Sequence, residues 1–302
     1  MIITGEQNKV KANFGGIIME QTKQKSNLVR AVIYWIIVAL CIAAGIMFLN
    51  MLPLIHSNST AFPANFLKWI AAGKDTKLIN SISSSFGYAG ILGAVLLACL
   101  YFVFKKVNYN VTGKSSTVNL AFTGMLAALV LVGYIFTIKL PIAGKAQIGF
   151  GNVFCIFSGL MIGPIYGGLA AGLGSFLYDV ITGWADTCVL TFVTKFVMAF
   201  VCGAIAWGIH GKLLNDSAKQ KKQIVHTIVA AVIGSVCYSI LYLTHGYIEG
   251  ILVGNAAKAL DTIMNVKLAV TIVNGLIADI VSIPLFYAIR AALKRSHLAF
   301  NA

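Results

Sequence analysis

The sequence predicts an all-α membrane protein with eight transmembrane helices. Of its 302 residues, 59% are hydrophobic and only 11% are charged, whereas charged residues make up about 25% of a typical soluble protein. Several apolar stretches approach the roughly 20 residues that a helix needs to cross a bilayer. No stretch shows the two-residue alternation of a transmembrane β-barrel, so the spans are expected to be helices.

Two predicted spans form an N-terminal hairpin, and six more form a second unit. The hairpin spans are residues 31–54 and 86–104, which carry few polar side chains and are expected to face lipid or another subunit. The loop between them is long enough for a short interfacial helix around residues 64–72. The six further spans are predicted at residues 118–138, 148–162, 164–181, 189–209, 224–243 and 266–293.

A polar, basic linker at residues 105–117 separates the two units. We therefore divide the chain into residues 1–117, which hold the N-terminal tail, the hairpin and the linker, and residues 118–302, which hold the six-helix domain. The first apolar stretch is too long for the core of a signal peptide, so it is expected to be a retained span.

The net charge of +14 reflects membrane topology better than it reflects nucleic-acid binding. With the N-terminus inside, 15 of the 23 lysine and arginine residues fall in cytoplasmic segments, 7 fall in outer loops, and Lys195 falls inside a span. Cytoplasmic loops of membrane proteins carry such an excess of basic residues. Both termini are therefore expected in the cytoplasm of a bacterial cell, and no nucleic-acid partner is expected.

Residues 158–175 form the most informative stretch, because small residues recur there at every fourth position. In a bilayer this spacing lets helix backbones approach closely. Pro164 cannot continue a preceding helix, so a tight turn is predicted between the spans 148–162 and 164–181. The recurring small residues are Gly159, Gly163, Gly167, Ala171 and Ser175.

Polar side chains from separate spans share the outer half of the predicted bilayer. Ionisable groups are costly in lipid, so they are expected to face protein or a water-filled site. Tyr238 and Tyr242 add two rings on one helical face. The cluster comprises Asn152, Tyr178, Asp179, Trp184, Lys195, Tyr238, Tyr242 and Asn274.

This cluster has two interpretations. It could line a pocket for a small, partly aromatic solute, with rings that stack and polar groups that orient the solute. Alternatively, Asp179 and Lys195 neutralise each other, and the tyrosines lie at the membrane interface. We favour the pocket for the cluster as a whole. Asp279, in the last span, either couples to an ion or bonds to a neighbouring helix, and we favour the bond.

Catalytic and metal-binding motifs are absent from the sequence. Residues 113–115 resemble the end of a nucleotide-binding P-loop, but Asn108 stands where its first glycine is required. No His-x-x-x-His pair or Gly-x-Ser-x-Gly elbow is present. The six cysteines form no Cys-x-x-Cys pair and are expected to be small buried hydrophobes. We therefore expect no enzyme activity, no metal and no cofactor.

Several short motifs follow one another in order over residues 118–209. They occupy residues 119–129, 139–144, 148–152, 163–164, 174–175, 179 and 192–195. Their order resembles the S components of energy-coupling factor (ECF) vitamin transporters, particularly the riboflavin-type group. S components are the substrate-binding membrane subunits of these importers. The resemblance is looser over residues 224–293 and does not cover residues 1–117.

The resemblance implies a six-helix S-component bundle, preceded here by the two-helix hairpin. In that family the loop at residues 139–149 closes over the substrate. Small residues of the first family helix contact the transmembrane coupling subunit, and these fall on Ala121, Gly124 and Ala128. Two ATPase subunits supply the energy. The chain would capture a water-soluble vitamin or vitamin precursor from outside, with riboflavin as the first expectation.

Two other functions remain open at this point. An ion-coupled secondary transporter could use Asp179 and Asp279 to carry protons. A membrane scaffold or accessory subunit would bind no solute at all. The sequence also leaves open other solutes, among them a pyrimidine or pyridoxine-type precursor, pantothenate and folate.

Overall fold

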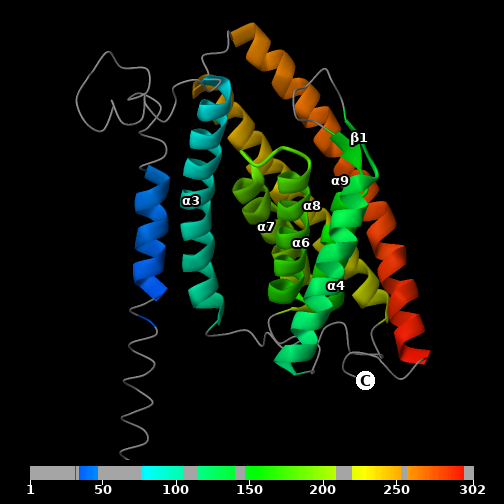
Figure 1. Ribbon diagram of the computed structural model, residues 1–302. Coiled ribbons are helices and arrows are strands. Elements are labelled where there is room, and N and C mark those ends of the chain that lie inside the picture. Colours follow the sequence, from blue (N-terminus) through cyan, green and yellow to red (C-terminus); the bar gives the residue numbers. More distant parts are fainter. Residues whose placement is uncertain are drawn as a thin grey trace, which may run out of the picture.

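The computed structural model describes residues 31, 34–46, 76–104, 115–139, 147–208, 220–252 and 257–295, which are helical almost throughout. Figure 1 shows an N-terminal helix and α3 beside a bundle of the remaining helices. The elements are helix Tyr34–Ile46, α3 (Thr76–Phe104), α4 (Ser116–Ile135), β1 (Thr137–Lys139), β2 (Gln147–Gly149), α5 (Gly151–Ile162), α6 (Pro164–Ile181), α7 (Cys188–Trp207), α8 (Gln220–Leu252) and α9 (Ala257–Arg295).

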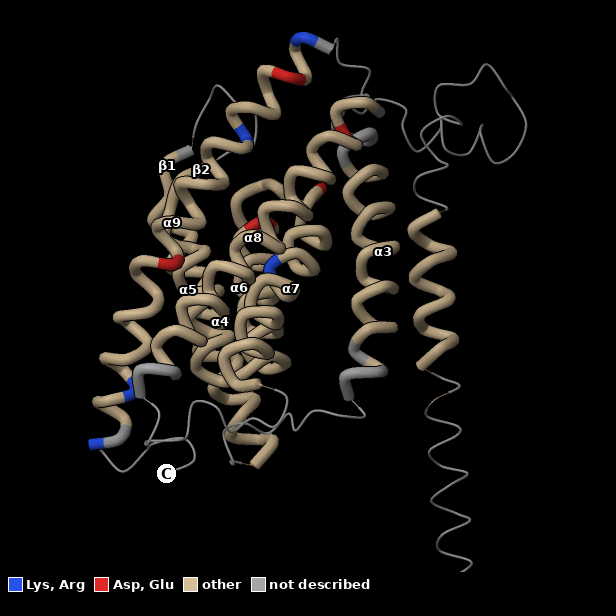
Figure 2. The backbone as a smooth tube through the Cα atoms, turned by 180° about the vertical axis from the view of Figure 1, so that it is seen from behind, with Lys and Arg blue, Asp and Glu red and all other residues tan. Residues whose placement is uncertain are grey.

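The molecule is an all-α, multi-pass membrane protein. Within the described residues, α3, α4, α7, α8 and α9 are long and apolar enough to cross a membrane. Charged residues are sparse along the helices, and those of α9 lie mostly toward its two ends (Figure 2). Helix Tyr34–Ile46 and α5 are apolar but shorter. The count of eight spans stays a prediction.

The short helix α5 lies at the centre of the bundle, where all of its residues except Phe154 are buried. It packs against α4, α6, α7 and α9. The longer helices carry exposed leucine, isoleucine and valine side chains on their outer faces. A buried central helix surrounded by helices with apolar outer faces is the arrangement expected in lipid.

The turn between α5 and α6 confirms the predicted break at Gly163 and Pro164. Gly163 has a φ of 84°, which favours glycine, and its N–H donates to the carbonyl of Gly159 at 3.1 Å. Pro164 then starts α6, where its missing N–H leaves no intrahelical bond unmade. The two helices therefore reverse direction without a loop.

Close helix packing explains the small residues around this turn. A Cβ on Gly159 would lie 2.3 Å from the carbonyl oxygen of Ala199 on α7. A Cβ on Gly174 would lie 2.4 Å from the carbonyl oxygen of Ala127 on α4. Both distances are below any real contact, so the backbones of these helices touch only because the side chains are absent.

The predicted end of the span 118–138 and the predicted start of the span 148–162 are wrong. α4 ends at Ile135 and α5 begins at Gly151. Between these helices, strands β1 and β2 pair antiparallel, with Thr137 opposite Gly149 and Lys139 opposite Gln147, and we call this pair the β1–β2 hairpin. Thr137 is partly buried and Ile138 is exposed, as in a strand that has one face toward the bundle and the other away from it.

The predicted extents of three other spans also need correction. α3 starts at Thr76, ten residues before the predicted span, and includes the serine-rich segment that we assigned to a loop. α8 reaches Leu252 and α9 starts at Ala257, so both continue well beyond their predicted apolar stretches. The interfacial helix expected around residues 64–72 lies outside the described residues.

The prediction that the N-terminal spans face only lipid or another subunit is wrong for α3. This helix packs against α7 and α8. Ala89 is buried there beside Leu190 and Val193 of α7. On its other side, a Cβ on Gly90 would lie 2.9 Å from the Cα of Gly45, so helix Tyr34–Ile46 packs closely on α3.

We expect Gly159→Ala to destabilise the protein because the added methyl group would overlap the backbone of α7. Overpacking of this kind costs about 1–3 kcal/mol. Thermal unfolding of the purified protein measures the effect. Gly124→Ala is the matched control, since no atom lies within 4 Å of a Cβ at that position on α4. Equal melting temperatures for the two variants would contradict the packing described.

Candidate functional site

A pocket lies at the end of the bundle that carries the β1–β2 hairpin. The open space that it encloses, including the solvent at its mouth, is about 970 Å³. Every element from α4 to α9 contributes to the wall. The lining residues are Tyr134, Thr137, Gln147, Gly149, Asn152, Asp179, Trp184, Thr187, Leu190, Thr191, Thr194, Lys195, Tyr238, Tyr242, His245, Glu249, Lys267, Val270, Thr271 and Asn274.

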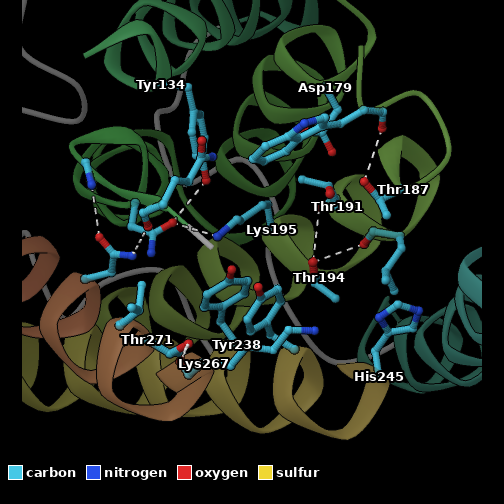
Figure 3. Close-up of a pocket in the computed structure, with 18 of the residues that line it drawn as sticks. Tyr134, Asp179, Thr187, Thr191, Thr194, Lys195, Tyr238, His245, Lys267 and Thr271 are labelled. Atoms are coloured by element: carbon cyan, nitrogen blue, oxygen red, sulfur yellow. Dashed lines mark hydrogen bonds between the residues drawn. The ribbon is translucent and has the colours of Figure 1, made fainter. Parts of the chain in front are cut away.

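A buried lysine forms the centre of the pocket. Figure 3 shows the Lys195 side chain between Tyr134 and Tyr238. Its Nζ donates to Oδ1 of Asn152 at 2.6 Å and lies 3.2 Å from the centroid of the Tyr238 ring. Lys195 is only 3% exposed. An ammonium group so far from water needs such partners, and an amide oxygen and an aromatic face supply them.

The two partners of Lys195, and the tyrosine that orients one of them, come from three other helices. Asn152 lies in the first turn of α5, and its Oδ1 also accepts a hydrogen bond from the Tyr134 hydroxyl of α4 at 3.0 Å. Tyr238 belongs to α8. An ammonium carries three donors, of which the bond to Asn152 uses one. The arrangement can therefore offer an N–H donor to a carbonyl oxygen or a ring nitrogen of a bound solute.

Aromatic rings provide flat apolar surface beside this donor. Tyr238 and Tyr242 stack with their centroids 5.8 Å apart and their planes 23° apart. Trp184 lines another part of the pocket. Rings in this arrangement favour a planar, partly aromatic ligand over a flexible aliphatic one.

Threonines form much of the remaining polar wall. Thr194 donates its hydroxyl proton to the carbonyl of Leu190 at 3.0 Å, and Thr271 donates to the carbonyl of Lys267 at 2.6 Å. Thr187 donates to the carbonyl of Trp184 at 3.1 Å. With their protons placed on the backbone, these oxygens can accept hydrogen bonds from hydroxyl or amide groups of a ligand.

Asn274 ties the β1–β2 hairpin to α9. Its Oδ1 accepts from the N–H of Gly149 at 3.1 Å, and its Nδ2 donates to the carbonyl of Gln147 at 2.7 Å. The side-chain amide thus pairs with β2 much as a neighbouring strand would. The hairpin covers one side of the pocket, so Asn274 acts on the pocket through the hairpin as well as by lining it.

Seven of the eight predicted site residues line the pocket, and Tyr178 does not. Tyr178 is buried behind the wall, where its ring stacks on Tyr134 with a centroid distance of 5.1 Å. Its hydroxyl donates to Oε1 of Gln147 at 3.2 Å. Tyr178 therefore supports Tyr134 and the hairpin from behind.

Several pocket residues are not among the eight predicted site residues, although the sequence held a signal for two groups of them. Tyr238, Tyr242, His245 and Glu249 continue one stripe at intervals of three or four residues along α8. The predicted span 224–243 stops short of His245 and Glu249, whereas α8 continues to Leu252 and carries both. Thr187, Thr191 and Thr194 form a similar stripe at the start of α7. For Tyr134 and Gln147 the sequence gave no comparable signal.

Asp279 lies away from the pocket and bonds to a neighbouring helix. Its Oδ1 accepts from the hydroxyl of Ser235 on α8 at 2.8 Å. This confirms the interpretation we favoured from the sequence. Among the described residues, no group of three or more histidine, cysteine, aspartate or glutamate side chains could hold a metal ion.

The fold and the pocket define a membrane-embedded protein that binds a small solute. Comparison with known proteins gives the class. Residues 114–291, more than half of the chain, match the family described as "ECF-type riboflavin transporter, S component". The chain belongs to this family. It is the substrate-binding subunit of an ECF transporter and not an enzyme, and it associates with the membrane and ATPase subunits of that transporter.

Further comparisons add little to this assignment. A protein of Pyrococcus woesei described as "Uncharacterized protein in gap 3'region" is 25% identical over 112 residues, which cover 37% of this chain and 67% of that protein. No solved structure matches the chain. Membership of the S-component family sets aside the secondary transporter and the scaffold without a ligand.

We expect Asn274→Leu to release the hairpin, because the substitution removes both bonds to β2. Two net hydrogen bonds contribute about 1–3 kcal/mol, so amide exchange at Gly149 should accelerate about 5- to 150-fold. Hydrogen exchange of the purified protein measures this. Asn265→Ala is the matched control, since Asn265 is exposed on the same helix. Equal exchange at Gly149 in both variants would show that Asn274 does not hold the hairpin.

Proposed function

We propose that the chain captures riboflavin, or a closely related planar vitamin, for ATP-driven uptake by its partner subunits. The observation that carries the proposal is the buried Lys195 amine, held between the Asn152 amide and the Tyr238 ring at the centre of an aromatic pocket. Riboflavin combines a flat ring system, an edge of carbonyl oxygens and ring nitrogens, and a chain of hydroxyls. Each part has a counterpart in the wall.

Each part of riboflavin would be bound by a different group of pocket residues. Tyr238, Tyr242 and Trp184 would stack against the ring system. Lys195 and Asn152 would meet its carbonyl-bearing edge, with Lys195 as donor. The hydroxyl chain would lie along the threonines and carboxylates of the wall. Asp179 would accept from that chain or from the ring imide N–H, and Asn274 would hold the hairpin over the ligand.

The proposed topology places the hairpin end outside the cell and both termini in the cytoplasm. Its support is the excess of basic residues in the segments that this orientation puts inside. The pocket then opens to the medium from which a vitamin is taken up. Residues 118–302 would form the substrate-binding domain, and residues 1–117 would add the two N-terminal helices.

The proposed docking surface for the transmembrane coupling subunit lies on α4. Ala121, Gly124 and Ala128 lie on one face of this helix, and all three are exposed. Small exposed residues let a partner helix approach closely in a bilayer. α3 packs on α7 and α8, so the added helix leaves this face open. Two ATPase subunits would complete the transporter.

We expect Lys195→Met to weaken riboflavin binding about 10- to 100-fold while the protein stays folded. Methionine keeps the apolar length of the side chain but removes the charged donor, and a hydrogen bond to a charged group contributes about 1.5–3 kcal/mol. Quenching of riboflavin fluorescence by the purified protein gives the Kd.

Lys258→Met is the matched control for this experiment, since Lys258 is exposed at the start of α9. The control should bind riboflavin as the unmodified protein does. A Kd for Lys195→Met equal to that of the control would refute the role of Lys195 in substrate binding. A melting temperature far below that of the control would show that the Lys195→Met variant had lost its fold. The Kd of Asn152→Ala would then test the Lys195–Asn152 centre, and a Kd equal to that of the control would refute it.

A further inference from the structure

A helix outside the family match contacts the wall of the pocket. The match begins at residue 114, whereas α3 ends at Phe104. Three consecutive serines of α3, Ser83, Ser84 and Ser85, are at most 2% exposed. A helix that only faced lipid would not bury three hydroxyls, because polar groups in a bilayer are placed against protein partners. These hydroxyls are therefore buried against protein, and the Ser85 hydroxyl contacts the bundle.

The contact reaches a residue that lines the pocket. The Oγ of Ser85 lies 3.4 Å from Nε2 of His245 on α8, and both side chains are buried. Tyr88, almost one turn further along α3, places its ring 5.5 Å from the imidazole at an interplanar angle of 52°. In Figure 3, His245 lies at the side of the pocket. The imidazole is thus held between α3 and the site.

Apolar packing fixes α3 in this position. Next to Ser85 and Tyr88, the buried Ala89 packs with Leu190 and Val193 of α7. Leu190 itself lines the pocket. The same stretch of α3 therefore supports the pocket wall at two points, one apolar on α7 and one polar on α8.

His245 also belongs to the stripe of α8 that builds the aromatic wall. It follows Tyr238 and Tyr242 on the same helical face and precedes Glu249. An imidazole can turn about its side-chain bonds and can donate or accept at either nitrogen. A hydroxyl partner at Nε2 restricts both the rotation of the ring and the donor or acceptor role of its nitrogens. The orientation that the ring presents to a ligand then depends on a residue that the bundle of residues 114–291 does not contain.

We propose that α3 is part of the substrate-binding site, and that Ser85 and Tyr88 are positioning residues that fix the His245 ring on the pocket wall. His245 is then a specificity-determining residue for a ligand with hydrogen-bonding groups near α7 and α8. The site would extend beyond the six-helix domain. The proposal uses riboflavin as its binding probe and in that respect rests on the proposed function.

The contact itself can be tested without any ligand. The chain has five histidines, so the ring-nitrogen NMR signal of His245 can be assigned by its loss in His245→Gln. We expect this signal to shift in Ser85→Ala and to return toward its original position in Ser85→Thr, which restores a hydroxyl. Ser83→Ala is the matched control, because Ser83 is an equally buried serine on the same helix. A His245 signal that Ser85→Ala leaves in place would overturn the proposal.

The effect on the ligand is tested with riboflavin binding to the full-length purified protein. Ser85→Ala should raise the Kd about three- to tenfold, because a misoriented His245 ring would lose up to one net hydrogen bond to the ligand, and Ser83→Ala should not. His245→Gln should also raise it. Because Ser85 acts through the ring, adding Ser85→Ala to His245→Gln should have no further effect.

The outcomes separate this proposal from the proposed substrate. If the unmodified protein binds riboflavin but Ser85→Ala and His245→Gln bind it equally well, α3 is not part of the site and the substrate assignment stands. Additive losses in the double variant would reduce Ser85 to a structural role and also overturn the proposal. If the unmodified protein binds no riboflavin, the substrate assignment fails, and the His245 signal alone decides for or against the contact.

Discussion

The site depends on keeping one lysine amine inside a membrane domain. Lys195 is almost fully buried, and its amine is held by an amide oxygen and an aromatic face that belong to two other helices. A cation–π contact that excludes water contributes about 2 kcal/mol, which offsets part of the cost of removing the amine from water. Asn152 in turn is oriented by Tyr134. Four helices must therefore hold their relative positions for the pocket to exist.

Glycine packing provides that fixed arrangement. Gly159 and Gly174 bring α5 against α7 and α6 against α4, at distances that no side chain would allow. The reversal at Gly163 places α5 and α6 side by side without a connecting loop. Asn152 lies in the first turn of α5, Asp179 in the last turn of α6, and Lys195 on α7. Close packing of these helices at their glycines therefore sets the positions of the polar groups near the hairpin end. The small residues do not line the pocket themselves, but they set the helix positions on which the pocket depends.

The sequence predicted the site better than it predicted the ends of the elements. Asp179, Lys195 and Asn152 could be recognised because a charge or an amide in an apolar span requires a partner. The extents of α3 and α8 could not, since Ser83–Ser85 and His245 resemble loop residues until their partners from distant parts of the chain are known. The β1–β2 hairpin was missed because Ile138 and Ile148 continue the apolar character of the adjacent helices. Tyr134 lies within an ordinary apolar stretch, and only the fold shows that its hydroxyl meets Asn152.

The identity of the bound molecule tests the central claim most directly, because a Lys195–Asn152 centre beside stacked tyrosines should select a planar, carbonyl-bearing vitamin. The full-length protein would be produced with riboflavin present and purified, and its absorption spectrum and the mass of any released small molecule would be measured. The account predicts a yellow protein with flavin bound in close to equimolar amount. A colourless protein that releases a non-aromatic solute, or that takes up no flavin when riboflavin is supplied, would contradict it.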